Sequence, residues 1–151
     1  MTDLDLSAHA LAGSKRNFTL NESLETVRAC SHELMRADAF DWLAANPGLK
    51  YDLIILDPPS LAKRQSERNG ALDAYLKLAS LSIKHLLPNG ILIACSCSAH
   101  VSAEEFFGNV RQAAVSCGRK YVELRTTGHA PDHPATFKEA DYLKAIYLRL
   151  T

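Results

Sequence analysis

The stretch YDLIILDPP, Tyr51 to Pro59, decides the fold of this 151-residue sequence. Its central residues, 53–56, are apolar without alternation, which predicts a strand buried on both faces, as in a parallel sheet. Asp57 is then expected at the carboxyl end of that strand, where open α/β sheets bind their ligands. Pro58 and Pro59 donate no backbone hydrogen bonds, so the strand must end there. A strand that merely ends in a proline turn remains the alternative.

Strands and helices alternate along the rest of the chain. The apolar run 91–98, ILIACSCS, predicts a second buried strand, and residues 71–87 carry an apolar stripe of helical period before it. Residues 121–128 and 142–150 are rich in β-formers and are expected to pair as an antiparallel ribbon. The remaining predicted elements are a strand closing at Asp5, a helix capped by Ser7 that runs to Asn21, a strand ending at Asp38, a short helix over 39–46 and a helix from Ser102 to Gly118. Together they predict one α/β domain over residues 1–151, with a doubly wound, mostly parallel, Rossmann-like sheet and an antiparallel C-terminal strand pair.

The composition excludes several classes of protein. Seventeen basic and seventeen acidic residues cancel, so the chain lacks the global positive field that usually marks an autonomous nucleic-acid-binding protein. Cys30, Cys95, Cys97 and Cys117 are too scattered for a disulfide scaffold or a zinc site, so no metal is expected. The N-terminus lacks the blocks of a signal peptide and no apolar run reaches membrane-spanning length, so a cytoplasmic protein without membrane contact is expected.

Three acidic residues stand at the ends of three predicted strands: Asp5, Asp38 and Asp57. An acid after an early strand of such a sheet can accept hydrogen bonds from the two hydroxyls of a ribose. An acid at the neighbouring strand end can accept from an adenine amino group, and the acid beside the proline pair can hold the group being modified. Each acid taken singly is also compatible with a helix cap or a solvated turn. Their recurrence at one sheet edge favours a nucleotide site.

Cys97 ends the strand that follows the one carrying Asp57. A thiol at that place can lie near a helix N-terminus, whose positive dipole end favours the thiolate. Alternation puts Cys95 and Cys97 on the same face of the strand, with Cys95 in the core and Cys97 near the edge. The alternative is a small buried hydrophobic residue, and the CxC spacing alone is a weak motif for redox or metal chemistry.

The loop after the proline pair carries Lys63, Arg64 and Arg68, a local basic patch that can contact RNA phosphates. Glu67 lowers the net charge of this loop, and ordinary solvated loop charges are the alternative. His133, in the segment PDHP, is either a substrate-side residue or a turn-forming residue before a proline.

Six stretches occur in the order found in class I S-adenosylmethionine-dependent methyltransferases: DLSAHALAGSKRNFTLN, RADAFDWL, YDLIILDPPSL, GILIACSCS, PDHP and YLKAIYLRL. Together they resemble the large-subunit ribosomal RNA cytosine-C5 methyltransferases that carry an N-terminal PUA domain. The resemblance covers essentially the whole chain. Its most specific part is DPPS combined with SCS at this separation, since either motif alone is weak.

The resemblance implies a role for the candidate cofactor residues and for the nucleophile. Asp5 matches the acid that binds the cofactor ribose, and Asp38 matches the acid that contacts adenine, with Ala39 and Phe40 beside the ring. Cys97 matches the nucleophile, whose thiolate adds to C6 of cytosine so that C5 becomes carbanion-like and takes the methyl group. The implied cofactor is S-adenosylmethionine.

The resemblance also implies the substrate side of the site. Asp57 and Pro58 match the motif that holds the target base beside the methyl group. By this resemblance Asp57 is expected to be the second catalytic residue, because it can hydrogen-bond the ring edge and stabilise the adduct. Pro59, Lys63 and Arg64 are expected on the same side. The implied partner is RNA, ribosomal by this resemblance, and its target base has to leave the stack to enter the site.

The sequence departs from this family at its N-terminus. In the family a first strand and a glycine-rich loop precede the position of Asp5 and cradle the methionine end of the cofactor. Here Met1 begins almost at the second strand. The missing strand belongs between the strands ending at Asp5 and Asp57, so two rows of backbone groups are expected to be unpaired. The chain is therefore expected to be a fragment or a truncated gene product, with weak or no cofactor binding by itself.

Two other functions stay open. An acid followed by Pro-Pro also occurs in enzymes that methylate exocyclic amines, although those sites usually have an aromatic residue where Ser60 stands. A truncated, catalytically inactive remnant that acts as an interaction surface is favoured by the missing glycine loop. A nicotinamide-dependent dehydrogenase is the most distant interpretation, because nothing resembles its glycine fingerprint.

Overall fold

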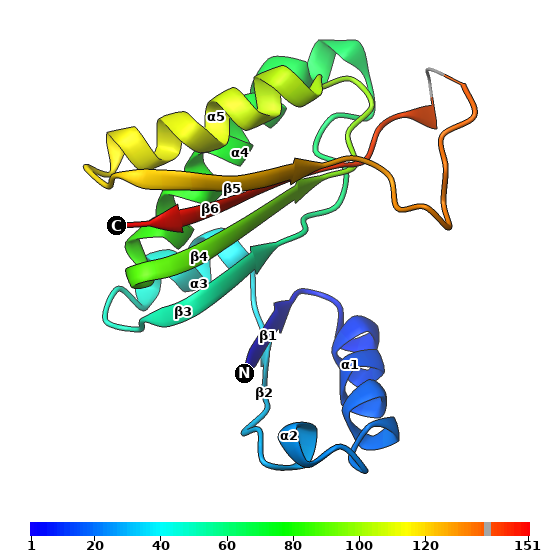
Figure 1. Cartoon of the computed structure of the whole chain (residues 1–151), viewed down its shortest axis with the longest axis vertical. Helices are drawn as coiled ribbons and strands as arrows, with labels where there is room; N and C mark the ends of the chain where they lie inside the picture. The colour runs from blue at the N-terminus through cyan, green and yellow to red at the C-terminus, as the bar shows by residue number, and fades with distance from the viewer. Residues whose placement is uncertain (138–139) are drawn as a thin grey trace. The chain divides into compact units, whose positions relative to one another are not determined.

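Two structural units make up the chain, residues 1–46 and residues 47–151. The computed structural model describes residues 1–137 and 140–151 (Figure 1). Within those ranges no helix is both long and apolar enough to cross a lipid bilayer. The expectation of one partial methyltransferase domain over residues 1–151 stays a prediction.

The first unit contains a two-stranded parallel sheet and three helices, in the chain order β1 (Thr2–Asp5), α1 (Ala8–Leu20), α2 (Glu25–Arg28), β2 (Glu33–Arg36) and α3 (Ala39–Ala45). β1 and β2 pair in parallel with Asp5 opposite Arg36, so both strands end at the same edge. Ser7 caps α1, since its Oγ accepts a hydrogen bond from the N–H of Ala10 at 3.2 Å. The sequence predicts all of these elements except α2.

A polar cluster holds α1 against the two strands. The hydroxyl of Ser14 donates to the carboxylate of Asp3, and the same carboxylate lies 2.9 Å from Nε2 of His32. The ring of Phe18 stacks on His32, with the ring centroids 3.7 Å apart. Burial would raise the pKa of Asp3, but the hydrogen bonds from Ser14 and His32 and the positive charge nearby outweigh burial, so the pKa is lowered.

The second unit contains a four-stranded mixed sheet in the order β3-β4-β6-β5. β3 and β4 are parallel, whereas β6 is antiparallel to both β4 and β5. The antiparallel C-terminal pair predicted from the sequence is thereby confirmed. In chain order the elements are β3 (Tyr51–Leu56), the 3-10 helix η1 (Gln65–Glu67), α4 (Arg68–Lys84), β4 (Leu86–Ser96), α5 (Ala103–Ser116), β5 (Tyr121–Thr127) and β6 (Lys144–Leu150).

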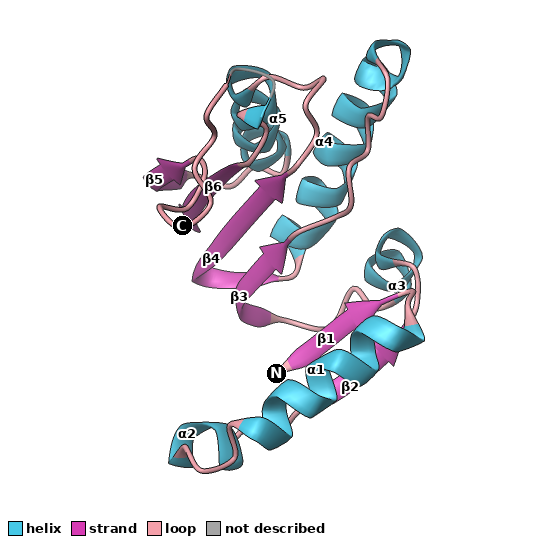
Figure 2. Ribbon diagram, turned by 90° about the vertical axis from the view of Figure 1, so that its right-hand side faces the viewer, coloured by secondary structure: helices cyan, strands magenta, loops and turns pink. Residues whose placement is uncertain are grey.

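Helices α4 and α5 pack on one face of this sheet (Figures 1 and 2). Their inward side chains form a hydrophobic core with alternate residues of β4 and β6. Fully buried members of this core include Ile83, Leu92, Phe106, Ile146 and Leu148. Burying a side chain of this size contributes roughly 1.5–3 kcal/mol relative to leaving it in water.

The opposite face of the sheet is open at β3. Leu53 is 48% exposed and Ile55 is 61% exposed, whereas Ile54 and Leu56 pack against the core. The prediction that residues 53–56 are buried on both faces is therefore wrong for the second unit, because both of its helices cover the same face. An unbroken apolar run does not reveal which of its faces has a covering layer.

The strands are divided between two sheets at the place where the sequence predicts a missing strand. β1 pairs with β2 and β3 pairs with β4, and no strand pairing joins the two sheets within residues 1–137 and 140–151. β3 is consequently an edge strand of its sheet. This division agrees with the expectation that the family's first strand, central in the usual order, is absent from these residues.

Helix α4 ends earlier than the helical stripe over residues 71–87 predicts. α4 ends at Lys84 and β4 begins at Leu86. The register between β3 and β4 shifts between Leu86 and Ile91, so residues 88–90 lie in a bulge of the strand. Asn89 has a φ of 64°. A Cβ on Gly90 would lie 2.9 Å from the carbonyl oxygen of Leu87, so the close approach of two backbone segments requires glycine here.

Candidate active site

Asp57 and Cys97 follow the carboxyl ends of β3 and β4, which are adjacent and parallel. Leu56 pairs with Ala94, so Asp57 lies beside the last residues of β4. Asp57 is exposed and Cys97 is half-buried, so neither is sealed inside the core. The structure thus brings both predicted catalytic residues to the same edge of the sheet, while their roles stay predictions.

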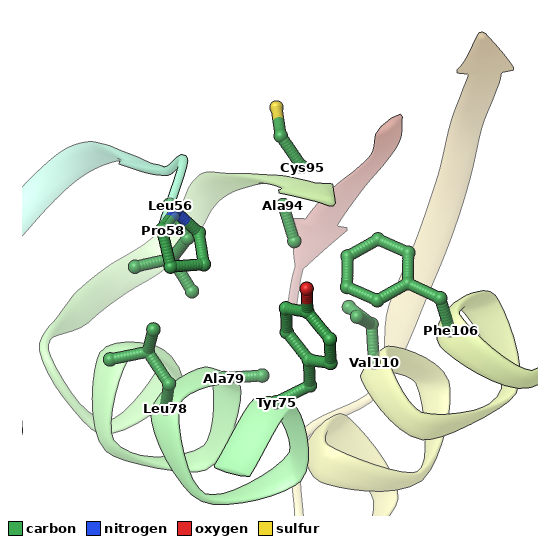
Figure 3. Close-up of a pocket in the computed structure, with 9 residues that line it drawn as sticks. All are labelled: Leu56, Pro58, Tyr75, Leu78, Ala79, Ala94, Cys95, Phe106 and Val110. Atoms are coloured by element: carbon green, nitrogen blue, oxygen red, sulfur yellow. The ribbon is translucent and has the colours of Figure 1, made fainter. Parts of the chain in front are cut away.

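Cys95 and Cys97 lie on the face of β4 that α4 and α5 do not cover. Burial alternates here: Ala94, Ser96 and Ser98 are buried, and the two cysteines between them are half-buried. Figure 3 shows the side chain of Cys95 directed away from that of Ala94. The shared face agrees with the prediction. The prediction that Cys95 lies in the core is wrong, because the core lies against the other face of β4.

Burial and the neighbouring Asp57 carboxylate raise the pKa of Cys95 to about 11. A thiol with that pKa is almost entirely protonated at neutral pH and is a poor nucleophile. Of the two cysteines on this face of β4, Cys97 is therefore the better candidate for thiolate chemistry.

A buried hydrogen-bond network joins the loop after β3 to the loop after β4. The hydroxyl of Tyr75, on α4, lies 2.9 Å from the hydroxyl of Ser96 and 2.8 Å from that of Ser98. Oγ of Ser98 also accepts from the backbone N–H groups of Leu61 at 3.1 Å and Ala62 at 3.3 Å. A buried network whose members are satisfied is rigid. These bonds therefore hold the loop after β3 and the loop after β4 in a fixed relation.

The backbone N–H groups determine which hydroxyls donate in this network. Two backbone N–H groups occupy the acceptor sites of the Ser98 hydroxyl, so its own proton goes to Tyr75 or to the hydroxyl of Ser60, 3.2 Å away. Oγ of Ser96 accepts from the N–H of Ser98 at 3.2 Å. Sequence patterns did not identify this network. Its signal was a tyrosine within the apolar stripe 71–87, since a buried phenol needs a polar partner.

A small apolar cavity lies next to this network, with a volume of about 10 Å³ (Figure 3). That volume holds at most one water molecule, so the cavity is part of the packing and not a ligand site. Pro58, a predicted substrate-side residue, is half-buried and lines the cavity. Pro59 is exposed.

A larger hollow of about 310 Å³ lies between the N-terminus of α5, the end of β5 and the start of β6. Its volume is at the lower limit of pockets that hold small organic ligands. Lys144 is part of the lining although it is only 7% exposed. The sequence contains a signal for this buried charge, because Lys144 occupies the same alternating positions as the inward residues Ile146 and Leu148.

Lys63 and Arg64 are exposed on the loop after β3, as a surface that contacts a polyanion requires. Arg68 differs from them, because its guanidinium pairs with Glu105 of α5. Glu67 accepts a hydrogen bond from the backbone N–H of Lys63 at 2.8 Å, which shapes the loop. The exposed positive charge of this loop therefore rests on Lys63 and Arg64, and their contact with RNA stays a prediction.

Asp5 and Asp38 follow β1 and β2, the two adjacent parallel strands of the first unit. Oδ1 of Asp5 accepts from the N–H of Ser7 at 2.7 Å. Oδ1 of Asp38 accepts from the N–H groups of Phe40 at 2.8 Å and Asp41 at 3.2 Å, which makes Asp38 the N-cap of α3. Asp38 thus has the helix-capping role that the sequence left open, and Asp5 has the turn role, since Ser7 is the N-cap of α1. The second oxygen of each carboxylate bonds to none of the described residues.

His133 is exposed in the loop between β5 and β6, and its role stays a prediction. Its carbonyl oxygen lies 3.0 Å from Nδ1 of His129. Nε2 of His129 accepts from the backbone N–H groups of Tyr142 and Leu143, each at 3.1 Å, so the proton is on Nδ1 and the ring organises the loop. Among the residues that the structure describes, no three His, Cys, Asp or Glu side chains are grouped to hold a metal ion.

Two relatives are similar to nearly the whole chain. Over 99% of its length it is 52% identical to a protein of Deinococcus radiodurans named ribosomal RNA large subunit methyltransferase, and it covers 36% of that protein. It is 35% identical to ribosomal RNA large subunit methyltransferase I of an Enterobacter species, of which it covers 38%. The chain therefore spans little more than a third of the length of these relatives. No protein-family model matches it.

Solved structures share its fold. A protein of Streptococcus mutans described as a SAM-dependent methyltransferase superposes with a TM-score of 0.78 and 24% identity, over 98% of this chain and 38% of that protein. SMU.776, described as a methyltransferase and complexed with SAH, gives a TM-score of 0.79 and 26% identity over the same shares. The predicted α/β methyltransferase fold, shortened relative to these proteins, is thereby confirmed.

Proposed function

We propose that this chain, which has the α/β fold of class I S-adenosylmethionine-dependent methyltransferases, is part of a cytoplasmic enzyme that methylates C5 of a cytosine in large-subunit ribosomal RNA. The names of the Deinococcus and Enterobacter relatives support this class of RNA as the substrate. The observation that carries the proposal is the position of Asp57 and Cys97 at the adjacent ends of two parallel strands.

Covalent catalysis solves the main chemical obstacle, which is that cytosine C5 is too weak a nucleophile to take a methyl group directly. The Cys97 thiolate adds to C6, a C–S bond forms, and the electron pair of the C5–C6 double bond becomes available at C5. C5 then bonds to the methyl group, a base removes the proton from C5, and the returning electron pair expels the thiolate. S-adenosylmethionine, when bound, would supply that methyl group as an electrophile, with the S–CH3 bond breaking and S-adenosylhomocysteine as the leaving group.

Asp57 binds the target base during this sequence. Its carboxylate is exposed at the end of β3 and can hydrogen-bond the edge of the ring, which stabilises the adduct. Pro58 and Pro59 restrict the backbone that follows and so limit the directions that the carboxylate can take. The neighbouring Cys95 does not compete as nucleophile, since its pKa is raised to about 11.

The first unit supplies the cofactor-binding residues. Asp5 and Asp38 each use Oδ1 for a bond to the local backbone and retain a second carboxylate oxygen, which fits the ribose hydroxyls and the adenine amino group. Ala39 and Phe40, half-buried at the start of α3, are the residues beside the adenine ring.

Lys63 and Arg64 bind the RNA. Both are exposed, and neutralising RNA phosphates releases counterions, so binding through them weakens as salt increases. The target cytosine is turned out of its stack to reach Cys97.

Ser60 supports methylation of C5 over methylation of an exocyclic amine. In place of an aromatic ring that would stack on a base, the chain has a serine whose hydroxyl donates to the carbonyl of Ala62 at 3.2 Å and lies 3.2 Å from the hydroxyl of Ser98. Ser60 thus shapes the loop after β3 and offers no stacking surface.

Covalent trapping tests the proposal. RNA containing 5-fluorocytosine is incubated with S-adenosylmethionine and either the full chain or a chimera that places it behind the preceding segment of the Deinococcus relative. Fluorine at C5 cannot leave as a proton, so the adduct persists and is seen as a slower band on a denaturing gel. We expect the adduct with the chimera, its loss in Cys97→Ala, and its retention in Cys95→Ala.

Two results would contradict the proposal. An adduct that survives Cys97→Ala would remove this cysteine from the mechanism. No adduct, together with no heat of S-adenosylmethionine binding for either protein in calorimetry, would favour the inactive remnant that the sequence left open.

A further inference from the structure

We infer that Lys144 is a positioning residue for Cys97: its ammonium group clamps the backbone beside the nucleophile and holds a positive charge near the thiolate. The inference rests on the proposed role of Cys97. Lys144 begins β6, and neither the resemblance nor the sequence motifs assign it a role.

The backbone is held on both sides of Cys97. On one side, Ser96 pairs with Lys144 in the antiparallel ladder between β4 and β6. On the other side, Nζ of Lys144 donates to the carbonyl oxygen of Ser98 at 2.8 Å. The same Nζ donates to the carbonyl oxygen of Tyr142 at 3.1 Å, so the loop before β6 is attached at the same point. Lys144 therefore constrains the residue before the nucleophile through its backbone and the residue after it through its side chain.

The two hydrogen bonds of Lys144 do not by themselves explain why a charged residue occupies this buried position. The alternate positions along β6 that share its face hold Ile146, Leu148 and Leu150, all fully buried, and a charge in such a row is costly unless it is compensated. Two carbonyl oxygens satisfy two of the three ammonium N–H groups, but a neutral donor would satisfy those carbonyls equally.

An electrostatic interaction with the Cys97 thiolate explains this charge. Burial lowers the pKa of Lys144, while the charges of the Cys97 thiolate and of the Asp141 carboxylate raise it, and burial has the larger effect. This interaction is mutual, so the ammonium that the thiolate stabilises also stabilises the thiolate. Other charged groups act on the neighbours of Cys97: the Asp57 carboxylate raises the pKa of Cys95, and the Asp141 carboxylate acts on Lys144 itself.

Thiol alkylation tests the inference without RNA or cofactor. The rate at which iodoacetamide modifies Cys97 is followed against pH in the full chain, with each cysteine located by peptide mass spectrometry. Lys144→Gln retains N–H donors for the carbonyls and removes the charge. We expect the midpoint of its Cys97 profile to move to higher pH, with alkylation slower by about tenfold at neutral pH. Lys144→Arg retains the charge, and we expect its profile to stay with that of the unmodified chain.

The controls separate this local effect from a general loss of structure. Lys120→Gln removes an exposed charge and is expected to leave the Cys97 profile unchanged. Cys117, half-buried after α5, reports loosening of the whole unit. A Cys97 profile in Lys144→Gln that overlays the unmodified one overturns the inference, and so does an acceleration at Cys97 that is matched by an equal acceleration at Cys117.

The arginine variant keeps the test decisive where Lys144→Gln does not fold. A Cys97 profile in Lys144→Arg that stays with the unmodified chain supports the inference, and a shift to higher pH overturns it. The alkylation experiment uses neither RNA nor cofactor. Absence of an adduct and of S-adenosylmethionine binding in the chimera contradicts the proposed function and does not change the alkylation result, so the two failures are distinguishable.

Discussion

The phenol oxygen of Tyr75 lies 2.8 Å from Oγ of Ser98, and this contact ties helix α4 to the loop that carries Cys97. Tyr75 is itself fixed by the core, since its ring packs edge-on against Phe106 with the ring centroids 5.0 Å apart. The core thus positions the phenol, and the phenol positions the loop after β4. Packing on one face of β4 determines the geometry of chemistry proposed on the other.

Tyr75→Phe is expected to destabilise the second unit by about 1–3 kcal/mol, because it leaves the buried hydroxyls of Ser96 and Ser98 short of a partner. The free energy of unfolding from urea titration measures this. Tyr147→Phe is the matched control: its ring faces Arg125 on the other side of β6, and we expect a change within about 0.5 kcal/mol. Equal losses in the two variants would contradict the role given to the Tyr75 hydroxyl.

Cys95 is expected to react with iodoacetamide only in strongly alkaline solution, because its pKa is raised to about 11. Asp57→Asn removes the repulsive charge and leaves the burial, so the reaction should begin at a somewhat lower pH than in the unmodified chain. Asp52→Asn, on the same strand at an exposed position, should have no effect. Rapid labelling of Cys95 at neutral pH would refute the prediction.

The first unit is expected to lose stability in acid through Asp3. A carboxylate with a lowered pKa contributes its full stability above the ordinary aspartate value of about 4, and that contribution is lost as the pH falls through the lowered value. Trp42, the tryptophan of the chain, lies in α3 and reports on this unit by its fluorescence. Asp3→Asn should lower the stability of the first unit at neutral pH and reduce the further loss of stability in acid. Glu22→Gln should leave both the stability and its dependence on pH unchanged.

Two glycines are expected to respond oppositely to alanine. In Gly90→Ala the new Cβ meets the carbonyl of Leu87 at 2.9 Å, so we expect a loss of about 1–3 kcal/mol in the free energy of unfolding. Gly108 lies within α5 with nothing in reach of a Cβ, so Gly108→Ala should stabilise by about 0.5–1 kcal/mol. Thermal denaturation distinguishes the two signs, and a stabilising Gly90→Ala would disprove the close approach.

Local rules predicted most elements of the fold. Ser7 and Asp38 cap the helices that follow them, Ser102 forms a capping box with Glu105, and Gly118 ends α5 with a φ of 68°. Each of these features depends on residues within a few positions of one another, which is why the sequence reveals them.

Long-range relations were less accessible. The exposure of Leu53 depends on which face of the sheet the helices of the second unit cover, and an apolar run does not indicate that face. The contact between Tyr75 and Ser98 joins residues far apart in sequence, so neither motif alone indicates it. Alternation placed Cys95 and Cys97 on one face but could not say which face of the sheet the helices cover.

The edge position of β3 has an expected consequence for this chain in concentrated solution. One side of its backbone is unpaired among the described residues, and Leu53 and Ile55 add exposed aliphatic surface to the same strand. Such a strand is a template on which further copies add by backbone pairing, the first step of cross-β aggregation. A charged side chain in place of Ile55 would interrupt that growth without touching the core.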